Sequence, residues 1–152
     1  MRSEENPIDL SDEKSFLDYI SNVDSACYES DLKYFRWNTV LDFQGKDETL
    51  LHTIADRKEH QPEAISYYKD ASKTEKTDSC SNFGSLQAIK VVKRNQSGVI
   101  LELELDFQNG AVSVQSEYNM RAILGCGITN ISLLDGSSVE MSILPSAYIS
   151  IQ

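Results

Sequence analysis

The nine residues VILELELDF, 99–107, decide the fold class, because apolar and acidic residues alternate along them from Leu101 onwards. Alternation with a period of two is typical of a half-buried β-strand, whose successive side chains point to opposite faces of a sheet. We therefore expect a strand with one face in the core and the other in water. The apolar face holds Val99, Leu101, Leu103, Leu105 and Phe107, and the acidic face holds Glu102, Glu104 and Asp106.

Further strands surround this stretch. Asn109-Gly110 is a strong hairpin signal, because both central residues of a type I′ turn adopt positive φ. Ser116 is suited to cap a short helix, which Gly125 and Gly127 would end. The other expected strands are 86–93, which precedes the Asn95–Gly98 turn, 111–115, a hairpin of 128–134 and 138–144, and a last strand at 147–151.

The N-terminal half favours helices. Ser11 suits the N-cap of an amphipathic helix over 11–22, and Asp47 suits the cap of a second helix. Pro62 is expected to begin a new helical turn, because proline is favoured at the first position of a helix. The remaining segments are an aromatic-rich strand from Tyr34 to about Asp42 and a polar loop at 71–85.

These elements predict an α+β fold, with N-terminal helices followed by a mainly antiparallel sheet of hairpins that includes a short helix. The 152 residues are enough for one domain. The net charge of -10 is concentrated in residues 1–31, which hold nine acidic and two basic residues. Within one domain, we therefore distinguish an acidic helical segment, 1–31, from an α+β portion, 32–152.

The charge and the apolar runs exclude several classes of protein. Nucleic-acid binding needs a surface rich in Lys and Arg, whereas this chain has 24 acidic and 14 basic residues. No apolar run approaches the roughly 20 residues that span a bilayer, and the first residues lack the pattern of an export signal. Cys27, Cys80 and Cys126 are too widely spaced for a zinc ribbon. Buried thiols, or one disulfide with a free thiol, remain as alternatives.

Few side chains form a recognisable catalytic pattern. His52, Asp56 and His60 share one helical face, which fits either a metal site or, as we prefer, a solvated polar stripe. Glu102 and Glu104 suit a general acid–base pair only if burial raises one pKa, so we interpret them as solvated charges. The aromatic residues Tyr28 and 34–37 fit a sugar-stacking platform or a buried strand. We predict no cofactor, metal or catalytic residue, and the sequence does not indicate an oligomeric state.

Three short motifs occur in an order that is informative. They are Lys93-Arg94 with Ser97-Gly98, then Glu117-Tyr118-Asn119-Met120-Arg121 with Leu124, then Leu144-Pro145-Ser146-Ala147-Tyr148. In this order, and with the upstream YFRW of 34–37, they resemble the later part of the stage II sporulation protein D (SpoIID) / LytB amidase-enhancer domain family. The resemblance covers roughly residues 30–151.

That resemblance implies a role in peptidoglycan remodelling outside the cytoplasmic membrane of bacteria. Members of the family cleave glycan strands or stimulate cell-wall amidases, notably during sporulation. The family's glutamate-bearing V-P-S-E segment and its Gly-His-rich loop are not present here. No catalytic residue can therefore be transferred, and we expect at most ligand or partner contacts. The candidates for such contacts are Trp37, Arg94, Arg121 and Tyr148.

Three hypotheses follow for the function. The first is a non-catalytic part of a cell-wall-remodelling protein, which acts as a scaffold or binds a glycan or a cell-wall enzyme. The second is a peptidoglycan lytic transglycosylase or amidase activator in its own right. The third is a protein-interaction module that uses the acidic N-terminal helix.

Overall fold

The computed structural model of the chain describes residues 9–21 and 37–151 and contains two antiparallel sheets. The helical elements are α1 (Glu13–Ser21), α2 (Asp47–His60), the 3₁₀ turn η1 (Pro62–Ala64) and α3 (Glu117–Gly125). The strands are β1 (Trp37–Leu41), β2 (Ile65–Tyr68), β3 (Lys76–Thr77), β4 (Leu86–Arg94), β5 (Ile100–Phe107), β6 (Gly110–Val114), β7 (Ile128–Leu133) and β8 (Ser138–Val139).

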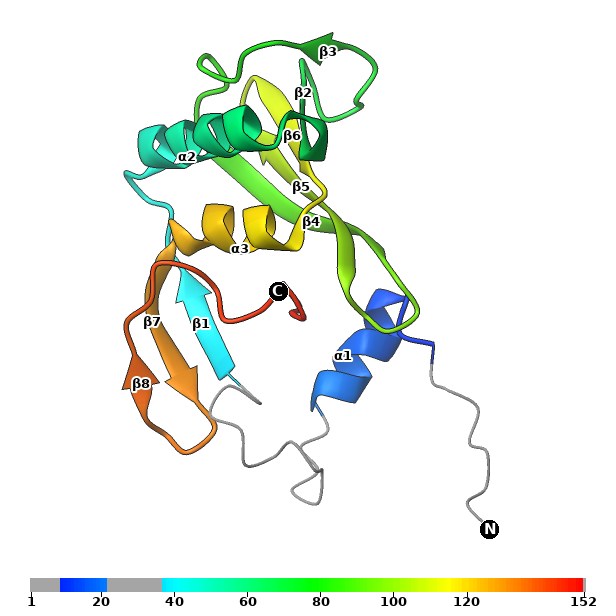
Figure 1. Ribbon diagram of the computed structural model, residues 1–152, viewed down its shortest axis with the longest axis vertical. Helices are drawn as coiled ribbons and strands as arrows, with labels where there is room; N and C mark the ends of the chain where they lie inside the picture. The colour runs from blue at the N-terminus through cyan, green and yellow to red at the C-terminus, as the bar shows by residue number, and fades with distance from the viewer. Residues whose placement is uncertain (1–8, 22–36, 152) are drawn as a thin grey trace.

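The larger sheet has the strand order β3-β2-β6-β5-β4, and the smaller has the order β1-β7-β8. Helices α2 and α3 lie side by side over one face of the larger sheet, while the smaller sheet extends beyond the end of α3 (Figure 1). Every strand pair is antiparallel. The α+β prediction, with hairpins and a short helix, is therefore confirmed.

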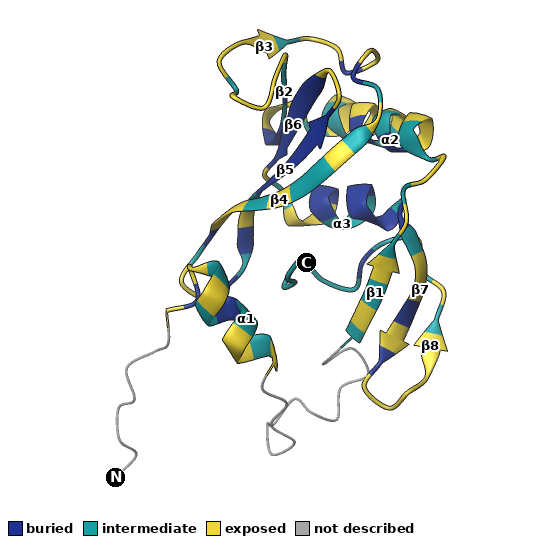
Figure 2. Ribbon diagram, turned by 180° about the vertical axis from the view of Figure 1, so that it is seen from behind, coloured by how far each residue is buried: buried dark blue, intermediate teal, exposed yellow. Residues whose placement is uncertain are grey.

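The core lies between the larger sheet and the two helices that cover it. Viewed from the opposite side, β5, β6 and α3 carry most of the buried positions, whereas α1, α2 and β8 are largely exposed or intermediate (Figure 2). Burial of such apolar side chains is the main favourable contribution to folding. The largest fully buried side chains include Leu50, Ile54, Ile65, Leu103, Leu105, Met120, Ile123, Leu124, Ile131 and Leu144.

Helix α1 forms where the sequence predicts a helix, but Asp12 caps it in place of Ser11. The Asp12 carboxylate accepts hydrogen bonds from the backbone N–H groups of Lys14 and Ser15. The hydrogen bond from Ser15 holds the pKa of Asp12 below its usual range. Phe16, the one fully buried residue of the helix, anchors α1 to the rest of the molecule.

The start of α2 and the short turn after it also differ in detail from the prediction. Asp47 is the first residue of the helix rather than its cap, and its carboxylate accepts a hydrogen bond from the backbone N–H of Leu86 at 3.0 Å. The interaction therefore joins α2 to the larger sheet. Pro62 begins the 3₁₀ turn as expected. The sequence pattern does not predict the strand β2 that follows. Pro62 favours a helix at this position, and β2 has only four residues.

Three expected features of the C-terminal half are wrong. Residues 147–151 form no strand, although their apolar residues alternate, and the strand expected at 138–144 is reduced to β8. The β5–β6 hairpin is present, but Phe107 pairs with Gly110, so Gln108 and Asn109 form the turn. Neither Asn109 nor Gly110 has a positive φ, which excludes the type I′ turn. Gly110 is needed for another reason, because a Cβ there would lie 2.4 Å from the ring of Phe83.

The acidic face of β5 is largely buried, which overturns the expectation that it is in water. Glu104 and Asp106 are buried, whereas Leu101 on the expected core face is exposed. The loop before β4 explains this difference, because Lys73 lies over β5 and pairs with Glu104 at 2.8 Å and Glu102 at 3.2 Å. Lys90 pairs with Asp106, whose Oδ1 atom is buried without a hydrogen-bond partner.

We expect Lys73→Met to destabilise the protein by about 1–3 kcal/mol at neutral pH, because it leaves two partly or fully buried carboxylates without their cation. The hydrogen bonds to Glu104 and Glu102 raise the pKa of Lys73 above its ordinary value of 10.5. A raised pKa of a cation means that its stabilisation is present below pH 10.5 and is lost as pH rises through the raised value. Urea unfolding at several pH values measures both effects.

The matched control is Lys69→Met. Lys69 forms an exposed ion pair with Glu75, and exposed pairs contribute about 1 kcal/mol or less. Equal losses of stability in the two variants, or a Lys73→Met loss that persists unchanged above pH 10.5, would contradict a role for the buried pairing.

Candidate functional site

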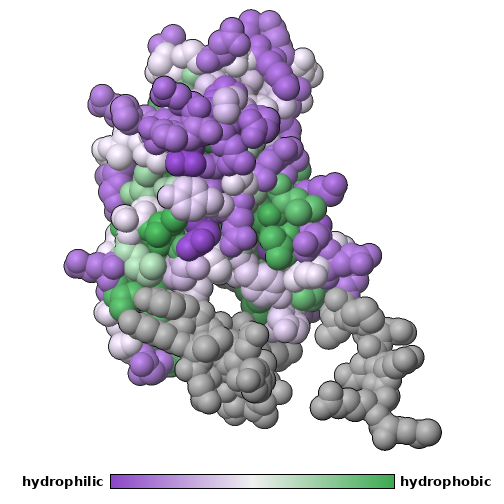
Figure 3. Space-filling view, in the orientation of Figure 1, coloured by the Kyte–Doolittle hydropathy of each residue, from purple (hydrophilic) through white to green (hydrophobic). Residues whose placement is uncertain are grey.

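A groove separates the smaller sheet from the larger one, and we call it the edge groove. Its volume is about 970 Å³, near the upper end of the roughly 300–1,000 Å³ typical of ligand pockets. The space-filling surface is hollowed in this region, between the smaller sheet and the β4–β5 hairpin (Figure 3). The groove is lined by Ile20, residues 37–41, Phe43, residues 86–89, Leu144, Ser146 and residues 148–151.

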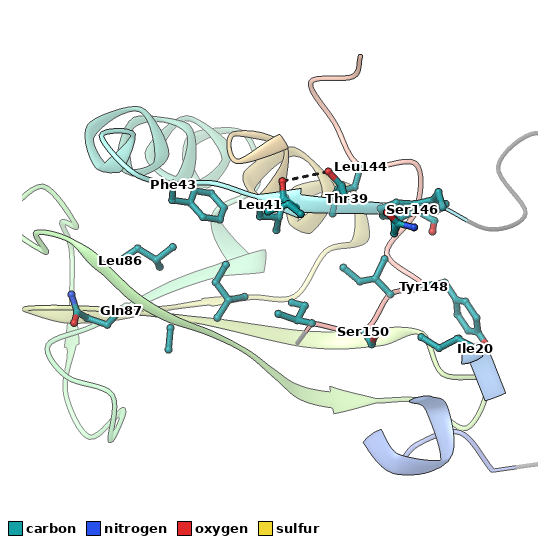
Figure 4. A pocket seen from close by; sticks show the side chains of 17 residues that line it. Ile20, Thr39, Leu41, Phe43, Leu86, Gln87, Leu144, Ser146, Tyr148 and Ser150 are labelled. Atoms are coloured by element: carbon teal, nitrogen blue, oxygen red, sulfur yellow. Dashed lines mark hydrogen bonds between the residues drawn. The ribbon is translucent and has the colours of Figure 1, made fainter. Parts of the chain in front are cut away.

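The walls of the edge groove come from segments far apart in the sequence. Strand β1 forms one wall and the beginning of β4 forms the opposite wall, while the C-terminal segment 144–151 runs between them (Figure 4). Tyr148 and Ile20 lie at one end, and Phe43 and Leu86 lie at the other (Figure 4).

Among the residues that the structure describes, the lining of the edge groove is uncharged. None of the 17 lining residues within 9–21 and 37–151 is Asp, Glu, Lys, Arg or His, although 25% of the chain is charged. Its polar groups are amides and hydroxyls, and the rest are aliphatic or aromatic side chains. Such a lining suits a neutral ligand. It offers no carboxylate pair for acid–base catalysis and no cation for a phosphate.

Trp37 and Tyr148, two of the residues expected to contact a ligand, both line the edge groove. Trp37 begins β1, is half-buried and packs against the core. The Tyr148 ring meets the ring of Phe16 edge to face, with centroids 4.8 Å apart. The structure therefore places in one groove two aromatic residues that are 111 positions apart in sequence, and each is only partly buried. Tyr28 and residues 34–36 lie outside the described residues.

Arg94, a third expected contact residue, lies behind the wall of the groove. Its side chain is 1% exposed, and its guanidinium lies 3.8 Å from the centroid of the Phe16 ring. It donates two hydrogen bonds to the Glu13 carboxylate, at 2.7 and 2.9 Å. It also donates to the carbonyl oxygens of Gly98 at 2.9 Å and Ile149 at 2.6 Å. Arg94 thereby connects α1, the β4–β5 hairpin and the C-terminal segment.

Arg121, the fourth expected contact residue, holds the other end of that segment. Its Nε atom donates to the carbonyl oxygen of Leu144 at 2.7 Å, and the Leu144 N–H donates to the Arg121 carbonyl at 3.2 Å. Gly98 permits the close approach of Tyr148, because a Cβ on Gly98 would lie 3.0 Å from that ring and 2.7 Å from Phe16. Residues from the three motifs therefore meet at the C-terminal segment 144–151, which lines the edge groove and which we call its C-terminal wall.

No protein-family model, curated protein or solved structure matches this chain. The interpretation of the edge groove therefore depends on its geometry and on the motifs.

The other candidate groups lie away from the edge groove. His60 contacts the backbone carbonyl of Asp56 through Nδ1 at 2.8 Å, while His52 and Asp56 are exposed. Among residues 9–21 and 37–151, no group of three or more His, Cys, Asp or Glu side chains is placed to hold a metal ion. In the same part of the chain, no helix is both long and apolar enough to cross a bilayer.

The two cysteines that the structure describes are free thiols. Cys80 is buried, and this burial raises the pKa of its thiol. Cys126 is half-buried, and its Sγ lies 3.2 Å from the hydroxyl oxygen of Thr53. Neither residue lines the edge groove. Cys27 lies outside the described residues.

Sequence reasoning missed most of the groove. Asn38, Thr39 and Gln87 are polar residues of its lining, and Phe43 lies at one end, but none belongs to a motif. The sequence signal for the groove is indirect. The sequence predicts the strand around Trp37 and the strand 86–93, but only the strand order shows that each has one edge with which no other described strand pairs.

Proposed function

We propose that this chain is a non-catalytic binding module of bacterial cell-wall remodelling, acting outside the cytoplasmic membrane and related to proteins of spore formation. In this role it holds a cell-wall enzyme or a glycan strand in the edge groove. The observation that carries the proposal is the meeting of the three motifs around the C-terminal segment, through the contacts of Arg94, Gly98 and Arg121. These motifs are the ones that resemble the amidase-enhancer family.

The uncharged lining supports binding rather than catalysis. Lytic cleavage of a glycan requires an acid–base group beside the scissile bond, and usually a carboxylate supplies it. The carboxylates of β5, Glu102, Glu104 and Asp106, are held by Lys73 and Lys90 and do not line the edge groove.

A glycan is the second candidate ligand, and the pair Trp37 and Tyr148 favours it. Aromatic side chains that are apolar in the body and polar at one end provide stacking surfaces for sugar rings. The amide and hydroxyl groups of Asn38, Gln87 and Ser146 are of the kind that hydrogen-bond to sugar hydroxyls.

The test uses the purified 152-residue chain and isolated bacterial sacculi. We expect the chain to sediment with the sacculi, or to accelerate muropeptide release by an added N-acetylmuramoyl-L-alanine amidase, and to release nothing alone. Trp37→Leu should weaken the effect about tenfold, the cost of one good contact. Leu134→Ala, at an exposed site away from the groove, should not change it.

Two results would overturn the proposal. One is release of anhydromuropeptides by the chain alone that disappears after a single Glu or Asp substitution. The other is neither sedimentation nor stimulation at low salt.

A further inference from the structure

We propose that the edge groove takes an extended, uncharged polypeptide segment, which pairs with β1 and becomes a fourth strand of the smaller sheet. This inference rests on the proposed function, because it names the ligand class of the same groove. Addition of a strand to an exposed sheet edge is a common mode of peptide recognition.

The lining of the groove shows that it follows a strand edge. All five residues of β1 and four consecutive residues of β4, Leu86–Ile89, line it. Because successive side chains of a strand point to opposite faces, a cavity over one face would contact alternate residues only. A cavity that contacts consecutive residues lies along the edge, where backbone N–H and C=O groups point outward.

Both walls are edges of their sheets. Strand β1 is hydrogen-bonded only to β7, and β4 only to β5, among the strands that the structure describes. The edge groove therefore lies between two strand edges that no other described strand covers, and the C-terminal segment 144–151 lines the space between them. Uncovered edges present backbone donors and acceptors to any extended chain that fits.

The hydrogen bonds of β1 identify which residues point into the groove. The Asp42 N–H donates to the carbonyl of Gly127 at 2.7 Å, and the Val40 carbonyl accepts from the Thr129 hydroxyl at 3.3 Å. Both groups face β7. The N–H and C=O of one strand residue point to the same side, and the side alternates along the strand. Thr39 and Leu41 therefore direct their backbone groups into the groove.

The irregularity in the β1–β7 pairing does not disturb this alternation. Between Thr39↔Ile131 and Leu41↔Ile128, β1 advances by two residues while β7 advances by three. The extra residue belongs to β7, so β1 keeps its period of two.

Strand β4 is a poorer template than β1. Its pairing with β5 shifts register between Leu86 and Ala88, between Val91 and Lys93, and between Lys93 and Arg94. Its first donor, the Leu86 N–H, is already bonded to Asp47. Bulges and covered donors are means by which proteins protect a sheet edge from strand addition. We therefore place the added strand on β1.

The chemistry of the groove restricts the occupant. A ligand with charged side chains would lose hydration without gaining an opposite charge from the described lining, since none of the lining residues within 9–21 and 37–151 is charged. Two outward residues of β1, spaced two positions apart, offer pairs of donors and acceptors about 7 Å apart. An extended polypeptide repeats its backbone groups at the same interval, whereas the hydroxyls of a glycan do not. Five strand residues match a segment of about five residues.

The experiment uses an acetylated and amidated TVTVTVT peptide, which is uncharged and favours an extended backbone. Amide hydrogen exchange of the full chain is followed by NMR with and without the peptide. We expect the amides of Thr39 and Leu41 to exchange more slowly when the peptide is present. The amides of Asn38 and Val40, which face β7, should change little.

Two variants at one position isolate the backbone donor. Thr39→Pro removes the N–H that points into the groove, and Thr39→Val keeps it. Both variants lose the hydrogen bond from the Thr39 hydroxyl to the Asn130 carbonyl at 2.6 Å. We expect Thr39→Pro to bind the peptide about tenfold more weakly than Thr39→Val, the effect of one hydrogen bond.

The exchange experiment on the unmodified chain remains decisive if Thr39→Pro does not fold. Unchanged exchange at Thr39 and Leu41 up to the solubility limit of the peptide would overturn the inference, as would equal affinities of two folded variants. If the chain sediments with sacculi but these amides never respond to the peptide, strand addition is wrong and the proposed function stands. If the peptide slows exchange at Thr39 and Leu41 but the chain neither sediments with sacculi nor stimulates the amidase, strand addition stands and the proposed function is wrong.

Discussion

Arg94→Met should lower the free energy of unfolding by about 3–5 kcal/mol, the largest loss expected from a single side chain in this protein. The Arg94 side chain is 1% exposed and donates hydrogen bonds to the Glu13 carboxylate and to the Gly98 and Ile149 carbonyls. Methionine fills similar space but donates nothing. Both carbonyls then lose their charged donor, and the stacking on Phe16 is lost as well.

The magnitude depends more on the carbonyls than on the ion pair. The Glu13 side chain is 43% exposed, so water stabilises its carboxylate when the guanidinium is absent. Glu13→Gln should cost about 1–3 kcal/mol, less than Arg94→Met, because it leaves the buried guanidinium without its counter-charge but keeps an acceptor for one of its hydrogen bonds. Urea unfolding of both variants measures the difference. If Arg94→Met costs no more than Glu13→Gln, Arg94 does not connect the three segments as we describe.

Gly98→Ala should cost about 3 kcal/mol, whereas Gly136→Ala should cost about 1 kcal/mol. Both glycines have positive φ, +88° for Gly98 and +84° for Gly136, so alanine is strained at either position by about 1–2 kcal/mol. Only at Gly98 does the added methyl group meet packed atoms, since it would lie 2.7 Å from the Phe16 ring. Overpacking a well-packed site adds about 1–3 kcal/mol.

The pair of glycine variants separates backbone strain from packing. No atom lies within 4 Å of the Cβ position at Gly136, so that variant reports strain alone. Thermal or urea unfolding gives the two losses of stability. Equal losses would mean that Phe16 and Tyr148 do not pack on Gly98, and the wall of the edge groove would then be built differently.

The parts of the fold that the sequence predicts are those with strong local patterns. The β4–β5 hairpin follows from alternation and from the turn around Gly98, and α3 follows from its apolar spacing and the glycines after it. These signals depend on neighbours in sequence. Register, turn type and strand length do not depend on sequence neighbours alone. The predictions of these features fail, as for the type I′ turn expected at Asn109-Gly110.

The failures have tertiary causes. The acidic face of β5 is buried because Lys73, about 30 residues upstream, covers it and neutralises two of its carboxylates. Residues 147–151 alternate like a strand, but no described strand pairs with them. Instead, the Ile149 carbonyl accepts a hydrogen bond from the Arg94 side chain, and the Tyr148 ring packs on the ring of Phe16. Local sequence does not contain either partner.

The candidate site was predictable only in part. The motifs predict Trp37 and Tyr148 as contact residues, and the structure places both in one groove. They also predict ligand contacts for Arg94 and Arg121, but the described hydrogen bonds of these residues go to the Glu13 carboxylate and to backbone carbonyls of the C-terminal segment. The groove itself depends on which strands end each sheet, and strand order is a property of the folded chain.

Trp37 provides the most direct measurement of groove occupancy, because it is the only tryptophan of the chain and lines the groove. The 152-residue chain labelled with 5-fluorotryptophan can be titrated with an N-acetylmuramoyl-L-alanine amidase and with solubilised sacculus fragments. We expect a saturable change of the fluorine resonance with at least one of them. An unchanged resonance with both ligands, or binding detected by calorimetry without any change at Trp37, would contradict a ligand site in the edge groove.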